Sequence, residues 1–466
     1  MYSLILHGRR LVQLQKCSNL SFSLNPLFAF SNYFSSSSAS VVTDVSSQEG
    51  ILKGKTFTVS YLVASLGLTT KLAESISRKV SFEEKGNPDS VLSLLRSHGF
   101  TDSQISSVIT NYPRLLILDA KKSIGPKLRS LQSREGGSTS ELTEILSKVP
   151  KILGKTGEKT ISIYYDFVKE VIEADKSVKF QKLCHSLPQE GSRQENKIRN
   201  LSVLRELGMP QQLLFPLLIS DYQPICGKGK FQESLKKVVE MGFDPTTLNF
   251  VDALTVVYGY SDKTLEERVN VYKRLGFSVE DVWEMFKKWP ISLRLTEKKI
   301  TNMFESLKKC GLLEDDVSTL FKRFPQCIGF SEHNITNTIE TFLVLGFSKD
   351  EFLVMVKRFP RCIGYSAETV KKKTSFLAKK MNWPLKALVF HPAGFGYSME
   401  KRIVPRCNVI KTLMSKGFLR SELPKMTSVL AITDQDFLNK FVRKHDDKAL
   451  VAELMAIFTR KEEKNK

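Results

Sequence analysis

The chain has 466 residues, of which 41% are hydrophobic and 26% carry charged side chains. No apolar run approaches the roughly 20 residues that a membrane-spanning helix requires, so the sequence predicts a soluble protein without a membrane partner. Lysine and arginine total 70 against 49 aspartate and glutamate residues, a net charge of +21 that favours a polyanionic partner. The same excess can instead serve solubility alone, and it then says nothing about partners.

Residues 1–45 are predicted to be a cleavable organelle transit peptide. No acidic residue occurs before Asp44, and Arg9 and Arg10 lie among leucines that could form a basic amphipathic helix. This composition is typical of organelle import signals. The early arginine pair and the Tyr33-Phe34-Ser35 stretch favour the mitochondrion, with the chloroplast as the alternative.

The strongest signal in the rest of the chain is a recurring spacing, in which four apolar residues at offsets 0, 3, 4 and 7 are followed at once by proline. Its copies run from Ile105 to Pro113, Leu142 to Pro150, Phe180 to Pro188, Val282 to Pro290, Val317 to Pro325 and Phe352 to Pro360. The offsets place the four side chains on one face of a two-turn helix, and proline disfavours helical geometry in the residue before it. Each copy therefore predicts a short helix with a fixed stop.

A glycine, mostly within Leu-Gly-Phe or a close variant, marks the end of another amphipathic helix upstream of each stop. These glycines are Gly99, Gly208, Gly242, Gly276, Gly311, Gly346 and Gly417. Glycine suits the left-handed residue that ends a helix. Because the glycines from Gly208 to Gly346 stand 34 or 35 residues apart, the register of the units is kept.

One unit is therefore a helix, a glycine turn, a second helix, a proline stop and a short connector. Neither helix could bury its apolar face alone, so neighbouring units must stack. We predict an all-α superhelical solenoid of about ten such helix-turn-helix repeats, each of about 35 residues, over residues 46–458, and a charged, disordered tail over residues 459–466.

Some units depart from the pattern. The unit after Gly242 lacks the proline and reads Val256-Val257-Tyr258-Gly259, and a later unit has Asn382 in the glycine position. Irregular units are either bends in the solenoid or sequence drift, and drift is the favoured interpretation.

The two alternating anchors, as in Leu345-Gly346-Phe347 followed by residues 359–366, resemble those of the mitochondrial transcription termination factor (mTERF) family in the form expanded in plants. The stretches 391–398 and 402–406 look like the last repeats of that family, and the resemblance covers residues 59–458. It implies a left-handed superhelix of units with two α-helices and a short 3₁₀ turn, whose basic groove holds organellar nucleic acid. Family members act in transcription termination or initiation, intron splicing and ribosome assembly, and the resemblance does not choose among these tasks.

Basic residues recur where each proline-stopped helix ends, and just after the stop. These candidate nucleic-acid-binding residues are Lys287 and Lys288, Lys322 and Arg323, Lys357 and Arg358, with Arg114 and Arg361 past the proline. A row of cations spaced unit by unit could follow a phosphate backbone. Alternatively, these residues only offset the helix dipole, which favours cations in any last helical turn.

Two further basic clusters complete the candidate site. The first is Lys371, Lys372 and Lys373, which the pattern places at the opening of a first helix, and the second is Lys401 with Arg402. Because the helix dipole disfavours cations at an N-terminus, a ligand-facing role is more plausible for the three lysines than for the other basic runs.

The aromatic residues before the prolines have two interpretations. Tyr112, Trp289, Phe324 and Phe359 could stack on bases, but they fall on the apolar face of their helix, so core packing is the favoured interpretation.

The sequence contains no recognisable catalytic or metal site. Its six histidines are far apart, and its seven cysteines include no Cys-x-x-Cys pair. The stretches Gly54-Lys55-Thr56 and Gly154-Lys155-Thr156 imitate the end of a phosphate-binding loop but lack its first glycine, so both are interpreted as turns. No enzyme activity, metal or cofactor is expected.

Our hypothesis is a monomeric, non-catalytic protein that binds organellar DNA or RNA and regulates gene expression through its basic groove. Double-stranded DNA, as in transcription termination or initiation, and intron RNA, as in splicing, both remain open as targets. The alternative is a protein-interaction scaffold in organelle ribosome or ribonucleoprotein assembly, a common use of helical solenoids.

Overall fold

A computed structural model describes residues 45–134, 139–176, 192–419 and 422–459 of the chain. The predicted leader, apart from its last residue, and the predicted tail, apart from Thr459, lie outside these residues, as does the repeat copy from Phe180 to Pro188. Every regular element in the described residues is a helix, which confirms the all-α helical-repeat fold. None of the described helices is long and apolar enough to cross a membrane.

The described residues divide into two compact units, one ending at Phe250 and the other beginning at Val251. The helices of the first unit are α2 (Val45–Leu66), α3 (Thr70–Ser77), α4 (Gly86–Ser97), α5 (Asp102–Asn111), η2 (Pro113–Ile117), η3 (Ala120–Ile124), α6 (Gly125–Arg134), α7 (Thr139–Lys148), η4 (Pro150–Gly154), α8 (Glu158–Lys176), α9 (Arg193–Glu206), α10 (Gln211–Ile219), η5 (Pro224–Cys226) and α11 (Gly229–Glu240). Helix α12 (Leu248–Gly259) spans the boundary.

The second unit carries most of the candidate site. Its helices are α13 (Asp262–Arg274), α14 (Val279–Lys288), η6 (Pro290–Arg294), α15 (Glu297–Lys309), α16 (Glu314–Arg323), η7 (Pro325–Gly329), α17 (Glu332–Val344), α18 (Lys349–Arg358), η8 (Pro360–Gly364), α19 (Ala367–Thr374), η9 (Ser375–Lys380), α20 (Leu385–Phe390), η10 (Pro392–Gly396), η11 (Met399–Ile403), α21 (Val404–Ser415), α22 (Met426–Leu430), α23 (Asp434–Phe441) and α24 (Lys448–Thr459).

The repeat that contains α17, α18 and η8 shows how local chemistry sets the element boundaries. The Ser331 hydroxyl accepts a hydrogen bond from the Asn334 amide at 3.1 Å and starts α17. Ser348 and Glu351 form a capping box at the start of α18, with bonds of 3.1 and 2.9 Å. Pro360 then ends α18 and begins the 3₁₀ helix η8, so the predicted proline stop is confirmed.

The glycine anchors all have the left-handed backbone conformation that the sequence predicted. Gly99, Gly208, Gly242, Gly276, Gly311, Gly346 and Gly417 have φ between 76° and 104°. Asn382, in the glycine position of the irregular unit, has φ 58° and is the one non-glycine residue with positive φ among the described residues. Asparagine replaces glycine there because its short side chain tolerates this conformation.

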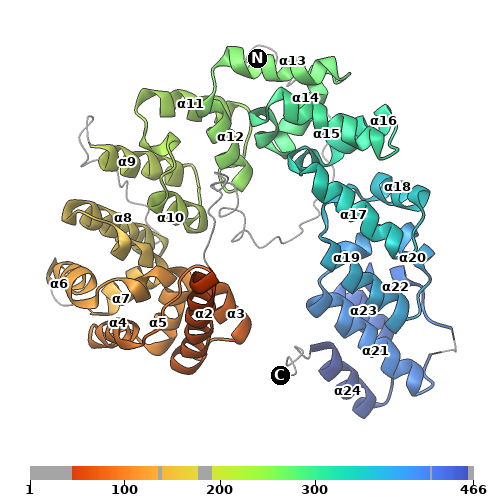
Figure 1. Cartoon of the computed structure of the whole chain (residues 1–466), viewed down its shortest axis with the longest axis horizontal. Coiled ribbons are helices and arrows are strands. Elements are labelled where there is room, and N and C mark those ends of the chain that lie inside the picture. Colours follow the sequence, from red (N-terminus) through yellow and green to blue (C-terminus); the bar gives the residue numbers. More distant parts are fainter. Residues whose placement is uncertain (1–44, 135–138, 177–191, 420–421, 460–466) are drawn as a thin grey trace. The chain divides into compact units, whose positions relative to one another are not determined.

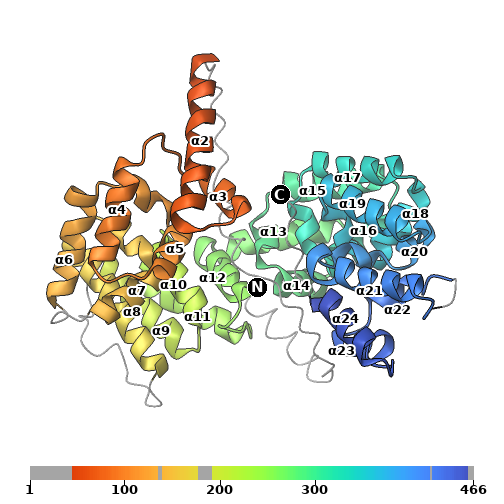
Figure 2. The same ribbon diagram turned by 90° about the horizontal axis from the view of Figure 1, so that it is seen from below.

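Like elements stack on like elements from one repeat to the next. In the second unit, the second helices α14, α16, α18 and α20 contact each other in turn, as do η6, η7, η8 and η10. The first helices form another row, in which α13 packs on α15 and α17 on α19. Figure 1 shows α18 and α20 on one side of this unit and α17 and α19 on the other, and Figure 2 shows the same helices turned by 90°.

The sequence pointed to two irregular segments. The unit after Gly242, which lacks the stop proline, has no 3₁₀ helix between α12, which runs to Gly259, and α13, which starts at Asp262. Gly54, however, lies inside α2, so the interpretation of Gly54-Lys55-Thr56 as a turn is wrong. Tertiary packing holds this segment helical: the Thr58 hydroxyl, which is fully buried, bonds to the carbonyl oxygens of Gly54 and Phe82 at 2.7 and 3.1 Å.

Candidate nucleic-acid interface

Most of the basic residues at the ends of the second helices in the second unit contact neighbouring repeats. We call Lys287, Lys288, Lys322, Arg323, Lys357 and Arg358 the cation ladder.

One member of each pair reaches forward to the next repeat. Lys288 Nζ donates a hydrogen bond to the Lys322 carbonyl at 2.7 Å. Arg323 donates to the carbonyls of Lys357 and Arg358, the latter at 3.2 Å, and Arg358 donates to the carbonyl of Phe390 at 3.1 Å. These carbonyls end helices and have no partner within their own helix. The forward-reaching cations therefore cap the helix of the following repeat.

The other member of each pair lies against a carboxylate. Lys322 Nζ is 3.3 Å from Asp281 and Lys357 Nζ is 2.9 Å from Asp316, in each case an acid of the preceding repeat. Lys287 pairs with Glu284 on its own helix and lies 5.7 Å from the centre of the Trp283 ring. The ladder thus does more than offset helix dipoles, because it joins successive repeats through specific contacts.

The ladder stays accessible despite these contacts. The side chain of Lys357 is 50% exposed and that of Lys322 is 40% exposed. The ladder does not continue into α20. Two residues before the stop proline, where α14, α16 and α18 have a basic residue, α20 has Phe390. Phe390 is 66% exposed, with the Arg358 guanidinium 5.3 Å from its ring centre.

The cations that follow the proline stops are exposed. Arg361 lies in the first turn of η8 and Arg114 in the first turn of η2, in the other compact unit. Lys151 occupies the same position in η4 and is also exposed, although the sequence pattern had not singled it out. The signal that identifies Lys151 is the one used for Arg114: a basic residue directly after a stop proline.

The structure corrects the placement of Lys371, Lys372 and Lys373. They were predicted to open a helix, but α19 begins at Ala367 because the Ser366 hydroxyl accepts a hydrogen bond from the Thr369 amide at 3.2 Å. The three lysines consequently lie beyond the first turn of a helix that continues without a break from α19 into η9, so the positive N-terminal end of the dipole does not act against them.

The three lysines also differ in exposure. Lys371 is exposed, and Lys372 is exposed with its ammonium 3.6 Å from Glu400. Lys373 is only 9% exposed and donates to the Phe395 carbonyl at 2.6 Å, and burial lowers the pKa of its ammonium. Its inclusion among phosphate-binding residues was therefore wrong, because its ammonium is turned inward.

Lys401 and Arg402 lie in η11, next to α19. Lys401 is exposed, whereas Arg402 is half-buried, 3.8 Å from Asp434 and 5.0 Å from the centre of the Tyr397 ring. Because the Lys372 and Glu400 side chains bridge α19 and η11, the exposed Lys371 and Lys401 belong to neighbouring elements. In the described residues, neither of these two side chains forms a hydrogen bond or an ion pair.

Other first helices also carry a lysine that, like Lys373, donates a hydrogen bond to a backbone carbonyl at the end of a 3₁₀ helix. Lys127 donates to the Leu153 carbonyl at 2.6 Å and Lys299 donates to the Phe330 carbonyl, each at the end of a 3₁₀ helix. Burial lowers the pKa of both ammonium groups. Nothing local in the sequence distinguishes Lys299 from its exposed neighbour Lys298, so only the structure shows this contact.

The aromatic residues before the prolines pack against neighbouring turns. Trp289 is 8% exposed, which confirms core packing for this residue. Tyr112, Phe324 and Phe359 are half-buried, with the Phe324 ring 5.9 Å from that of Phe330.

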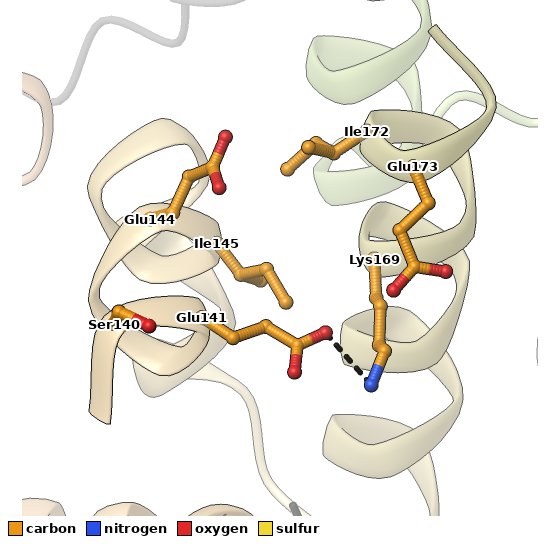
Figure 3. A pocket seen from close by; sticks show the side chains of 7 residues that line it. All are labelled: Ser140, Glu141, Glu144, Ile145, Lys169, Ile172 and Glu173. Atoms are coloured by element: carbon orange, nitrogen blue, oxygen red, sulfur yellow. Dashed lines mark ion pairs between the residues drawn. The ribbon is translucent and has the colours of Figure 1, made fainter. Parts of the chain in front are cut away.

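Other surface features do not suit a polyanion or a metal. A pocket of about 280 Å³ between α7 and α8 is lined by Glu141, Glu144 and Glu173, and its one lysine, Lys169, pairs with Glu141 at 2.7 Å (Figure 3). Within the described part of the chain, no group of three or more histidine, cysteine or acidic side chains could hold a metal ion.

The sequence was also compared with known proteins. The model of the family described as mTERF matches residues 92–438, a range that contains every residue of the candidate site. No curated protein matches the sequence.

Proposed function

The chain belongs to the mTERF family, and from that premise we propose that it regulates organelle gene expression by holding nucleic acid against the exposed cations of its repeats. Members of this family are organellar nucleic-acid-binding regulators of gene expression and are generally non-catalytic, so this general role follows from membership. The more specific proposal is transcription termination or initiation on duplex DNA, or intron splicing on RNA.

The observation that carries the proposal is the group of exposed cations at neighbouring positions of the second unit. Arg361 on η8 and Lys371 on α19 lie on elements that both contact η10, and the Lys372–Glu400 ion pair joins α19 to η11, which carries Lys401. Solvated cations of this kind bind phosphates with release of counterions, and the affinity then falls steeply with salt.

Titration of the protein against duplex DNA and against group II intron RNA at several salt concentrations tests the proposal. We expect binding tighter than micromolar to one of them at low salt, with a linear fall of log affinity against log salt. Micromolar or weaker affinity for every nucleic acid at low salt would contradict it. Crosslinking in purified organelles, followed by sequencing of the bound nucleic acid, would identify the target.

A protein-interaction scaffold is the second candidate, and one observation favours it. Leu313 is 71% exposed and Val344 is 80% exposed, and both flank glycine turns of successive repeats. Leu313 follows its turn glycine by two residues and Val344 precedes its own by two, and exposed apolar side chains that gather into a patch mark surfaces that bind other proteins. If the protein binds no nucleic acid but co-purifies with ribosomal or ribonucleoprotein particles, this candidate takes the place of the first.

We propose the mitochondrion as the organelle, on the basis of the leader composition described above. Expression of the full chain with a C-terminal fluorescent tag, imaged against mitochondrial and plastid markers, distinguishes the two organelles.

A further inference from the structure

Two lysines of the cation ladder are held by carboxylates that occur at the same place in successive repeats. Asp281 is the third residue of α14 and Asp316 is the third residue of α16. Each acid precedes its lysine by 41 residues, since Asp281 pairs with Lys322 and Asp316 with Lys357. The repeat geometry therefore builds the same ion pair twice.

These ion pairs are solvent-accessible and easily exchanged. The exposed fractions of the side chains are 40% and 30% for Lys322 with Asp281, and 50% and 21% for Lys357 with Asp316. Pairs exposed to this degree add little to stability. A phosphate that approaches either lysine meets an ammonium already paired with a negative group, which it must displace.

We propose that Asp281 and Asp316 compete with nucleic-acid phosphates for Lys322 and Lys357, and so determine which ligands the protein retains. The inference rests on the proposed nucleic-acid binding. A ligand that places phosphates at both lysines at once replaces both carboxylates, whereas a ligand that reaches only one lysine leaves the other pair intact. The two acids thus weaken binding to short or badly aligned ligands more than binding to a well-aligned one.

The next repeat supplies a matched control. Glu351 is the third residue of α18 and caps it in the same way, by accepting a hydrogen bond from the Ser348 amide. The lysine position of the following repeat, three residues before the stop proline, is filled by Val389. Glu351 accordingly forms no ion pair with any described residue.

The experiment compares D281N/D316N with E351Q and the unsubstituted full chain. Asparagine and glutamine keep an oxygen that accepts the capping hydrogen bond, so all variants should fold, and thermal melting verifies this. For a duplex or RNA that the protein binds, we expect D281N/D316N to raise affinity roughly threefold or more, since each exposed pair contributes a fraction of a tenfold change. E351Q should change affinity by much less per carboxylate removed.

A double-mutant cycle separates direct competition from a general charge effect. In K322A/K357A the acids have nothing to compete for, so adding D281N/D316N should raise affinity by no more per carboxylate than E351Q does. The competition would be overturned if E351Q and D281N/D316N raised nucleic-acid affinity equally per carboxylate removed. It would also be overturned if D281N/D316N raised affinity equally with and without Lys322 and Lys357. If the unsubstituted protein binds no nucleic acid, the proposed function fails first and this inference falls with it.

Discussion

The ring of Phe330 lies against Gly364 of the following repeat, so closely that a Cβ on Gly364 would sit 2.6 Å from two ring carbons. One repeat earlier, a Cβ on Gly329 would lie 3.0 Å from the ring of Trp289, an aromatic residue at a different position of its repeat. The 3₁₀ helices η7 and η8 thus each end in a glycine that lets an aromatic residue of the preceding repeat approach the backbone. At these two positions the contact limits how closely successive repeats can approach each other.

Substitution of Gly364 by alanine should destabilise the second unit by about 1–3 kcal/mol, because the added methyl group overpacks the contact with Phe330. Chemical denaturation measures the loss. The matched control is Gly259→Ala at the end of α12, where a Cβ meets nothing within 4 Å. Equal destabilisation by both substitutions would show that the close approach does not hold the repeats together.

Arg406 should be among the most stabilising charged residues of the C-terminal helices. It is 0% exposed and donates to the carbonyls of Val429 and Ile432 at 2.8 Å each, and to Asp434 at 2.5 Å. Arg406→Met should cost about 3–5 kcal/mol, since it leaves buried carbonyls without donors. Arg402→Met, which removes a longer and more exposed contact with Asp434, should cost under about 1 kcal/mol in the same denaturation assay.

Substitutions of Arg323 and Arg361 should differ in their effect on stability, because Arg323 holds neighbouring repeats together and Arg361 faces solvent. Arg323→Met removes the hydrogen bonds to the end of α18 and should destabilise the protein by about 1 kcal/mol. Arg361→Met makes the same change of charge at an exposed site and should stay within about 0.5 kcal/mol of the unsubstituted protein. A larger stability loss for Arg361→Met than for Arg323→Met would reverse our assignment of the two roles.

Replacement of Arg361, Lys371 and Lys401 by alanine should weaken nucleic-acid binding without destabilising the fold. The slope of log affinity against log salt should become shallower by roughly 0.7–0.9 for each phosphate that the variant no longer neutralises. Lys373→Met provides the comparison, because its ammonium faces the Phe395 carbonyl and its removal should leave the slope unchanged. An unchanged slope in the triple variant would remove these three residues from the interface.

Lys197 should make stability depend on pH in the alkaline range. It is 4% exposed, and burial lowers the pKa of its ammonium to about 8 from an ordinary 10.5. Between these values the unfolded chain binds a proton that the folded protein has released, so stability should rise with pH relative to Lys197→Met. The rise should be on the order of 3 kcal/mol between pH 8 and 10.5, measured by denaturation at several pH values. If the difference in free energy of unfolding between the unsubstituted protein and Lys197→Met did not change with pH, the prediction would be wrong.

The sequence alone determined the two helices of each repeat, the left-handed glycine turn and the proline stop. These features depend on interactions within a few residues, such as the capping of α18 by Ser348 and the effect of Pro360 on the residue before it. Interactions of this kind can be recognised from neighbouring residues in the sequence. For this reason even the left-handed turn at Asn382, where asparagine replaces the glycine, could be predicted.

Only the tertiary structure decided which cations face solvent. Lys371 and Lys373 are two residues apart in one basic run, yet one is exposed and the other donates to a carbonyl of the next repeat. The same holds for Lys322, whose partner Asp281 lies 41 residues away. A lysine side chain is long enough to reach either water or a neighbouring backbone, and the stacking of the repeats places the carbonyl or carboxylate that decides between them.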